Sequence, residues 1–205
     1  MKENKKEKIE KTVDMVTCKL RRINSRELAN LFNKLKKYGP QYNQIMGFSG
    51  DISKEIWFQR LFNSLYKLRL RRRPRDEYRA FYDLFQKLRK TNNKKKHSLK
   101  DILQKVHHAT NKWHYSFSTK ILHTLDDTKP IYDSRIGKLF DMTAPIVRNC
   151  YILEEHYGTY IQVIKKLLKE NDVNKILAKL GGELADFKKI SSVKKLDFVL
   201  WRLEV

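Results

Sequence analysis

Hydrophobic residues along this chain recur every three to four positions, which is the period of an α helix with one buried face. The stretch NSRELANLFNKLKK shows the period most clearly, with apolar side chains on one face at Leu28, Leu31, Phe32 and Leu35. Asn24 and Glu27 precede this face at capping-box spacing, and Gly39-Pro40 follows it. The pattern predicts a helix between these signals and a loop from there to about Gly50.

The same period predicts helices along the rest of the chain. Apolar faces mark helices near 56–68 and 78–88, and Ser98 with Asp101 has capping-box spacing at the start of another. Further helices are expected at 116–125, after Asp133 as an N-cap, and at 145–157, 159–169, 172–180 and 191–204. Strand-like alternation and repeats of fixed period are absent from the sequence. The predicted fold class is therefore all-α.

Length and composition indicate how these helices are organised. The 205 residues include 40% hydrophobic and 11% aromatic side chains, which is enough for a core. Residues 13–205 are expected to form a single all-helical globular unit, or two closely packed helical subdomains. Residues 1–12 are mostly Lys and Glu, and they are expected to be a disordered basic arm.

The charge balance points to a polyanionic partner. With 45 Lys and Arg against 23 Asp and Glu, the formal net charge is +22. Self-repulsion of this size opposes a compact state, and a polyanion neutralises it. Nucleic acid, and duplex DNA in particular, is the expected partner. One alternative stays open, because lysines encoded by an AT-rich genome also lie solvated on helix faces with no partner.

The sequence has no sign of membrane attachment. It contains neither a long apolar span nor a helix with an uninterrupted apolar face. Residues 1–11 are charged and lack the apolar core of a signal peptide, so the protein is expected in the cytoplasm, at the nucleoid if it binds DNA. A monomer is the working expectation.

Metal and cofactor sites are not expected. Cys18 and Cys150 are too few for a disulfide framework, a zinc cluster or an iron–sulfur site. The histidines at 107, 108 and 114 have no acidic or cysteine partner at ligand spacing. The sequence also lacks a phosphate-binding glycine loop and a serine-hydrolase elbow.

Two loop-like stretches carry the densest positive charge. The first contains Arg69, Arg71, Arg72, Arg73 and Arg75, and the second contains Lys94, Lys95 and Lys96. Arginine suits phosphate because its planar fork bonds two oxygens. These residues are predicted DNA contacts that set affinity and register without reading sequence. A nuclear-localisation-like run or a solvated loop is the alternative.

The segment WHYSFSTKILHTLDDTKPIYDSRIGKLF, residues 113–140, departs most from generic helical sequence. It places Lys120 early in one helix and Asp133 at the cap of the next. Here the chain resembles the helix-hairpin-helix DNA glycosylases, the superfamily of endonuclease III and the 8-oxoguanine glycosylases with their archaeal branch. Those enzymes have a hairpin, a lysine at the start of a helix, and then a Pro-Val-Asp-x-His/Arg-Val segment. The counterparts here are residues 116–120 and 130–136.

This resemblance implies a compact helix-hairpin-helix fold and base-excision chemistry, with oxidised purines as the favoured substrate. Lys120 would be the nucleophile that displaces the damaged base and holds the sugar as a Schiff base, with or without associated AP lyase activity. Asp133 would activate the nucleophile or stabilise positive charge on the sugar. A lysine amine becomes nucleophilic when desolvation or nearby cations lower its pKa. A carboxylate at a helix N-terminus keeps its charge.

The resemblance also implies contacts around this pair. Expected DNA contacts at the hairpin and the next helix start are His114, Ser116, Ser118 and Arg135. Archaeal 8-oxoguanine glycosylases have a Trp-bearing helix near the C-terminus that contributes to the base pocket, and Trp201 would fill that role. Trp57 and Phe58 are further candidate pocket walls. For all three aromatic residues, a place in the core is the alternative.

Two other function classes remain open. In a non-enzymatic helical DNA- or RNA-binding protein, Lys120 would be one more phosphate contact and Asp133 only a cap. In a protein-interaction module with an acidic partner, the charge is explained but the Lys and Asp pairing is not. DNA binding that weakens steeply with salt would separate the first two classes from the third.

Overall fold

The computed structural model describes residues 4–68, 75–91, 97–146 and 149–203, and the regular structure within these ranges is helix, with no β strand. The α helices are α1 (Lys5–Arg21), α2 (Ser25–Leu35), α3 (Tyr38–Gly47), α4 (Ile56–Leu65), α5 (Arg75–Lys90), α6 (Leu99–Thr110), α7 (Tyr115–Leu125), α8 (Ser134–Leu139), α9 (Cys150–Leu167), α10 (Asn171–Glu183) and α11 (Ser192–Arg202). A short 3-10 helix, η2 (Ala185–Phe187), precedes α11. The predicted all-α class is confirmed.

Three helix starts predicted from local sequence are confirmed. The Asn24 side chain accepts from the Glu27 N–H, and the Glu27 carboxylate accepts from the Asn24 N–H, at 2.9 Å each. Ser98 and Asp101 form the same reciprocal pair at the start of α6, and Asp133 caps α8. Each cap satisfies backbone N–H groups that have no partner within the first helical turn.

The N-terminal segment differs from the expected disordered arm over 1–12, because α1 begins at Lys5. The side chain of Asn4 caps this helix by accepting a hydrogen bond from the Lys6 N–H at 3.2 Å. Apolar residues at helical spacing are buried, and these are Ile9, Val13, Val16 and Leu20. They belong to a helix that packs on α9 and α10. Burial of this stripe orders a segment whose composition alone suggested disorder.

The expected loop from Gly39 to about Gly50 is also wrong, since α3 occupies most of it. Pro40 lies in the first turn of α3, where a missing N–H costs no hydrogen bond. Gly39 lies against η2, and a Cβ at this position would come 2.8 Å from both Asp186 Cβ and the Phe187 ring. This glycine therefore permits a close helix approach, and it does not terminate a helix.

The two helices expected at 145–157 and 159–169 are one continuous helix, α9, which runs through Gly158. The Asn149 side chain caps it by accepting from the N–H groups of Tyr151 and Ile152. A glycine inside a helix costs only about 1 kcal/mol relative to alanine. Packing of α9 against α1 and α6 outweighs that cost.

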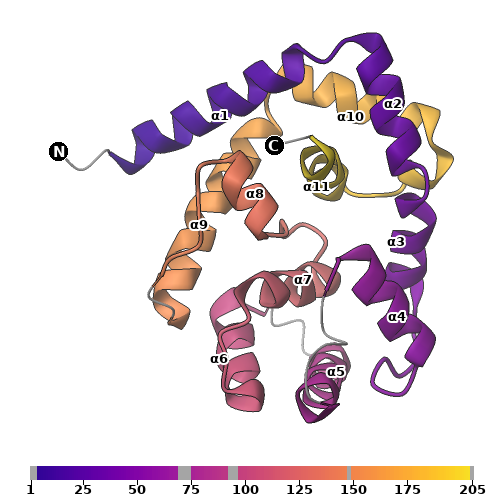
Figure 1. Cartoon of the computed structure of the whole chain (residues 1–205), viewed down its shortest axis with the longest axis vertical. Coiled ribbons are helices and arrows are strands. Elements are labelled where there is room, and N and C mark those ends of the chain that lie inside the picture. The colour runs from indigo at the N-terminus through magenta and orange to yellow at the C-terminus, as the bar shows by residue number, and fades with distance from the viewer. Residues whose placement is uncertain (1–3, 69–74, 92–96, 147–148, 204–205) are drawn as a thin grey trace.

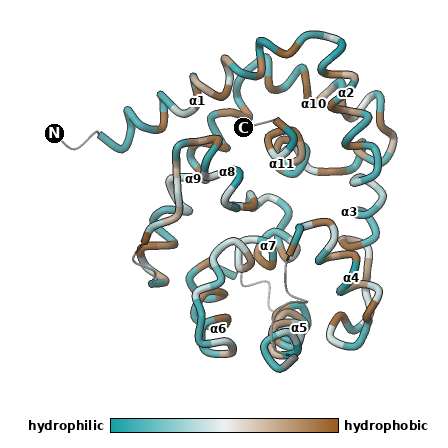
Figure 2. Tube along the Cα trace, in the orientation of Figure 1, coloured by the Kyte–Doolittle hydropathy of each residue, from teal (hydrophilic) through white to brown (hydrophobic). Residues whose placement is uncertain are grey.

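The helices surround α11, which lies near the centre of the view with α1, α2 and α10 above it and α4 to α6 below it (Figure 1). Hydrophobic positions recur along the helices as short stripes between hydrophilic ones (Figure 2). The buried apolar side chains form one cluster with members from every α helix. Because α11 contacts α2, α8 and α10, its side chains meet residues from distant parts of the chain.

Helices α6 and α7 pack against each other as a helical hairpin joined by residues 111–114. Asn111 ends α6 in the left-handed conformation, with φ of 53°, a region that asparagine tolerates better than most residues. This turn places Lys120 in the second helix of the hairpin, shortly after the turn.

Candidate active site

A small cavity lies where α11 meets α7, the end of α4 and the residues before α8. Its lining is made by Leu65, Tyr66, Lys120, Ile131, Asp133, Lys194, Asp197, Phe198 and Trp201. Four of these nine residues are charged. The volume is about 20 Å³, which is room for one water molecule. The cavity is therefore closed to any larger ligand in this conformation.

Lys120 reaches this cavity from α7 with only 3% of its surface exposed. Its Nζ donates to Ser116 Oγ at 2.6 Å and to the Ser116 carbonyl at 3.3 Å. Burial lowers the pKa of the Lys120 ammonium, and the nearby charge of Lys194 adds to the lowering, whereas the Asp133 and Asp197 carboxylates oppose it. The site thus favours the neutral, nucleophilic amine more than water does.

Asp133 approaches the same cavity from the start of α8. Its Oδ1 accepts hydrogen bonds from the backbone N–H groups of Arg135 and Ile136, at 3.0 Å each. Both of these bonds go to one oxygen, so Oδ2 carries neither of them. The positive end of the helix dipole further stabilises the carboxylate. The side chain is therefore a cap and a fixed negative charge beside Lys120.

Thr119 fastens α7 to the segment that carries Asp133. Its hydroxyl accepts from the Tyr132 N–H at 3.2 Å, and its one proton is shared between the Tyr132 carbonyl at 3.1 Å and the Ser116 carbonyl at 2.9 Å. Thr119 and Tyr132 each precede a cavity residue by one position, and both are buried. The two bonds between Thr119 and Tyr132 hold Lys120 and Asp133 in a fixed relation across 13 residues of sequence.

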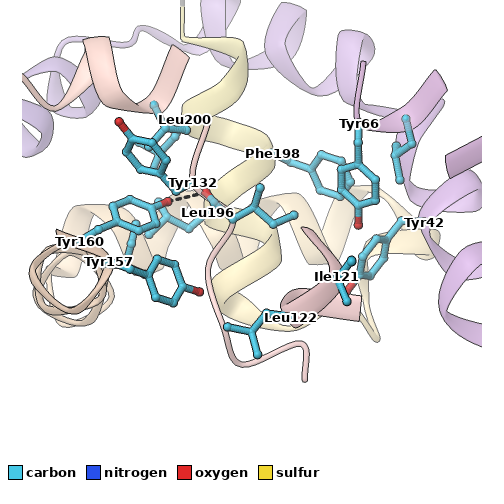
Figure 3. Packing of buried hydrophobic residues seen from close by; sticks show 14 of the residues in the cluster. Tyr42, Tyr66, Ile121, Leu122, Tyr132, Tyr157, Tyr160, Leu196, Phe198 and Leu200 are labelled. Atoms are coloured by element: carbon cyan, nitrogen blue, oxygen red, sulfur yellow. Dashed lines mark hydrogen bonds between the residues drawn. The ribbon is translucent and has the colours of Figure 1, made fainter. Parts of the chain in front are cut away.

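A second buried lysine and carboxylate line the cavity, and the sequence analysis did not find them. Lys194 and Asp197 are 2% and 8% exposed, and Lys194 Nζ lies 2.5 Å from Asp197 Oδ2. The same ammonium lies 4.2 Å from the centre of the Phe198 ring and 4.9 Å from that of Tyr66. The rings of Phe198, Tyr66 and Tyr42 gather on one side of α11 (Figure 3). Ion pairing and ring contacts together stabilise a charge that burial disfavours.

Burial moves the pKa values of this pair in opposite directions. It lowers the pKa of Lys194 and raises the pKa of Asp197, because the charged form of each group loses its hydration. Each partner opposes the shift of the other through the 2.5 Å contact. The sequence signal for these residues was their position on a helix whose neighbours at 196 and 198–200 are all apolar.

A neutral histidine lies near this cluster. His123 is fully buried, and its Nδ1 donates to the Lys129 carbonyl at 2.6 Å. Nε2 then accepts from the Tyr42 hydroxyl at 2.9 Å. Burial, reinforced by the charge of Lys194, lowers the pKa of His123 to about 3. His123 therefore adds no positive charge to the site at neutral pH.

The structure brings one of the three candidate pocket aromatics to the cavity. Trp201 lines it, whereas Trp57 and Phe58 do not. Phe58 is 0% exposed and packs against Phe62 in the core, and Trp57 is 47% exposed and meets the edge of Phe48. The expectation that Trp57 and Phe58 form walls of the Lys120 pocket is therefore corrected, because α4 presents both side chains elsewhere.

Of the expected DNA contacts of the hairpin, Ser118 lies in the interior, whereas Ser116 and His114 are half-buried. Ser118 is fully buried, and its hydroxyl donates to the His114 carbonyl at 3.1 Å. Ser116 bonds Lys120, and His114 Nε2 lies 3.0 Å from the Glu77 carboxylate of α5. Ser118 thus has no surface with which to meet a phosphate.

Arg135 alone of the four expected contacts at the hairpin and the next helix start is exposed, at the start of α8. The loop cations lie elsewhere in the chain. Those outside the described residues are Arg69, Arg71, Arg72, Arg73, Lys94, Lys95 and Lys96. Arg75 is the first residue of α5. The structural argument for nucleic acid therefore depends on cations in other segments.

Across residues 4–68, 75–91, 97–146 and 149–203, no three His, Cys, Asp or Glu side chains are grouped so that they could hold a metal ion. Within the same ranges, no helix has the length and apolar character needed to cross a bilayer.

Comparison with known proteins returns no match to this chain among family models, curated proteins or solved structures. Function is therefore inferred from the side chains that the fold gathers around the cavity.

Proposed function

We propose that this chain is a DNA glycosylase that excises a damaged base through Lys120 and Asp133, with oxidised purines as the favoured substrate class. One observation carries the proposal: Lys120 on α7 and Asp133 at the N-cap of α8 line the same small cavity. The helical hairpin of α6 and α7, whose second helix carries Lys120, and the capped start of α8 at Asp133 support a helix-hairpin-helix glycosylase-like fold.

The reaction follows from the two side chains. The neutral amine of Lys120 attacks C1′ of the damaged nucleotide, and a C–N bond forms while the glycosidic bond breaks and its electron pair leaves with the base. The departing base gains a proton and the amine loses one. Opening of the sugar ring then gives a Schiff base, and water releases it. Asp133, fixed by two backbone bonds, stabilises the positive charge that develops at C1′.

The small volume of the cavity requires a widening step before this chemistry. A cavity of about 20 Å³ holds one water molecule, and a base is several times larger than water. An extruded base must therefore displace part of the lining. Trp201 is half-buried, and it lines both this cavity and an open groove beside it. Rotation of its ring is the simplest route into the site.

The test is borohydride trapping on duplexes that carry 8-oxoguanine, uracil or an abasic site. Wild-type protein is compared with Lys120→Gln and Asp133→Asn. Asparagine caps helices about as well as aspartate, so Asp133→Asn removes the charge and keeps the fold. We expect a covalent adduct with wild type, none with Lys120→Gln, and at least tenfold slower trapping with Asp133→Asn. The absence of both adduct and base release on every duplex would overturn the proposal.

The small volume of the cavity favours a second candidate, a non-enzymatic helical protein that binds DNA or RNA. In that case Lys120 is a buried structural group and Asp133 is only a helix cap. The two candidates differ in one result. Only the enzyme gives an adduct that depends on Lys120, while both give binding that weakens steeply with salt.

A further inference from the structure

Two adjoining hollows open beside the cavity, on the surface formed by α1, α2, α8 and α11. One has a volume of about 430 Å³ and the other about 450 Å³. They share Lys34, Arg202 and Leu203 in their lining, so they form one continuous groove. Trp201 lines the first hollow and also the Lys120 cavity. The groove therefore leads along the surface to the candidate active site.

The lining of this groove is strongly cationic. Among the described residues that line it, the charged ones are the cations Lys19, Arg22, Lys34, Arg135, Lys138 and Arg202, against one carboxylate, Glu27. The Glu27 side chain already accepts a hydrogen bond from the Asn24 backbone in the capping box of α2. We call these six cations and the two hollows the cationic groove.

Three cations of the groove, Lys19, Arg22 and Lys138, are available to a ligand. All three are exposed, and no carboxylate in the described part of the chain lies in ion-pair range of any of them. Arg202 donates to the Tyr38 hydroxyl, but its buried Nε has no hydrogen-bond partner among the described residues. Such charges repel one another when no anion is bound.

Two guanidinium groups flank the passage from the groove to the cavity. Arg135 lies 5.2 Å and Arg202 lies 5.0 Å from the centre of the Trp201 ring, both within the range of cation–π contacts. A phosphate on either side of an extruded nucleotide would meet one of these forks as its base reached Trp201. The planar guanidinium group of an arginine can bind two phosphate oxygens at once.

We propose that the cationic groove binds the sugar–phosphate backbone of duplex DNA on the strand that delivers a nucleotide past Trp201. The direction of the strand toward Trp201 rests on the proposed glycosylase function, whereas the backbone contact does not. Single-stranded nucleic acid is the weaker fit, because such ligands need a series of aromatic platforms. Trp201 is the one aromatic residue among the described residues that line the groove, and two arginines already contact it.

The experiment compares two double charge reversals by fluorescence anisotropy on a labelled duplex with a central abasic analogue. Arg22→Glu with Lys138→Glu changes the groove. Lys188→Glu with Lys189→Glu is the matched control, since both lysines are exposed and neither lines the groove. Each double variant lowers the net charge by the same amount. Any loss of DNA affinity caused by the lower overall charge is therefore equal in the two variants.

The groove variant is expected to bind at least tenfold more weakly than the control, and the slope of log Kd against log salt should fall by roughly 1.8 for two lost phosphate contacts. Equal weakening of duplex binding in both variants would overturn the proposal that the groove binds DNA. So would a single-stranded RNA or an acidic peptide that competes better than the duplex and depends on the same two residues.

Trapping assays on the same proteins separate this inference from the proposed enzyme. Groove-dependent binding without any adduct would leave the backbone site standing and remove the glycosylase. An adduct that both double variants form equally well at every protein concentration would support the enzyme and overturn the groove.

Discussion

Lys194 Nζ and Asp197 Oδ2 lie 2.5 Å apart in the first turns of α11, and both side chains are buried beside Lys120. Lysine is almost never buried without a partner. The pair therefore accounts for how a second lysine can enter the interior of this protein. It also places a positive and a negative charge within reach of the candidate nucleophile.

Removal of one member of this pair should cost far more than removal of both. Asp197→Asn leaves the Lys194 ammonium unpaired, so the free energy of unfolding should fall by about 3–5 kcal/mol. The double variant Lys194→Met with Asp197→Leu should lie much closer to wild type. Urea denaturation gives the free energy of unfolding of wild type, Asp197→Asn and the double variant.

The exposed pair Lys179 and Glu183, at 3.7 Å, is the control for that experiment. Glu183→Gln should change stability by less than about 1 kcal/mol. If the single and double variants of the buried pair were equally unstable, the two charges would not act as a unit.

The charges of Lys194 and Asp197 should move the pKa of Lys120 in opposite directions. Lys194 lowers that pKa and Asp197 raises it. Lys194→Met should therefore raise the pKa of Lys120, and Asp197→Asn should lower it. The ¹³Cε chemical shift of Lys120 followed by NMR against pH gives this value without any assay of activity. Shifts of the same sign in both variants would contradict the arrangement.

Acid should destabilise the fold through His123. Its pKa is about 3 in the folded protein against 6.5 for a free histidine, so the unfolded chain binds the proton first. The stabilising contribution is fully present above pH 6.5 and is lost as the pH falls toward 3, by about 1.4 kcal/mol per pH unit. His123→Asn should flatten the pH dependence of unfolding between these limits. An unchanged slope in that variant would assign the acid sensitivity to other groups.

Gly39 and Gly158 should respond oppositely to alanine. A Cβ at Gly39 would lie 2.8 Å from Asp186 Cβ and Phe187, so Gly39→Ala should cost about 1–3 kcal/mol by overpacking. A Cβ at Gly158 meets nothing within 4 Å, so Gly158→Ala inside α9 should stabilise by about 0.5–1 kcal/mol. Thermal unfolding of both variants measures the difference. Destabilisation by Gly158→Ala would mean that α9 needs the flexibility of glycine.

Features set by a few neighbouring residues were predictable from sequence. The caps at Asn24, Ser98 and Asp133 were correct because a side chain and a backbone N–H three positions apart meet in any helix start. The first helix was missed because its apolar stripe lies within a run of Lys and Glu. The start of α3 was missed because a Gly-Pro pair occurs both after the end of a helix and within the first turn of one. The sequence around Gly39-Pro40 does not distinguish these two cases.

The residues of the candidate site were likewise predictable only where a short segment of sequence contains them. Lys120 and Asp133 were named from a short segment, and the structure places both on one cavity. Lys194 and Asp197 were missed because a lysine and an aspartate three positions apart on a helix are ordinarily a solvated pair. Their burial is set by Tyr66 and Phe198, and contacts between α4 and α11 cannot be read from a local pattern. The cationic groove likewise comes from four helices.

The closed cavity also bears on affinity. If the open conformation makes up about 1% of the molecules, the apparent Kd for an extruded nucleotide is about a hundredfold weaker than the Kd of the open form. Replacement of Trp201 by alanine would raise the open population and would also remove a ring on which the nucleotide could stack, so its two effects on affinity oppose each other. In this molecule, selectivity among bases would then depend on which lesions stay unstacked long enough to meet the open state.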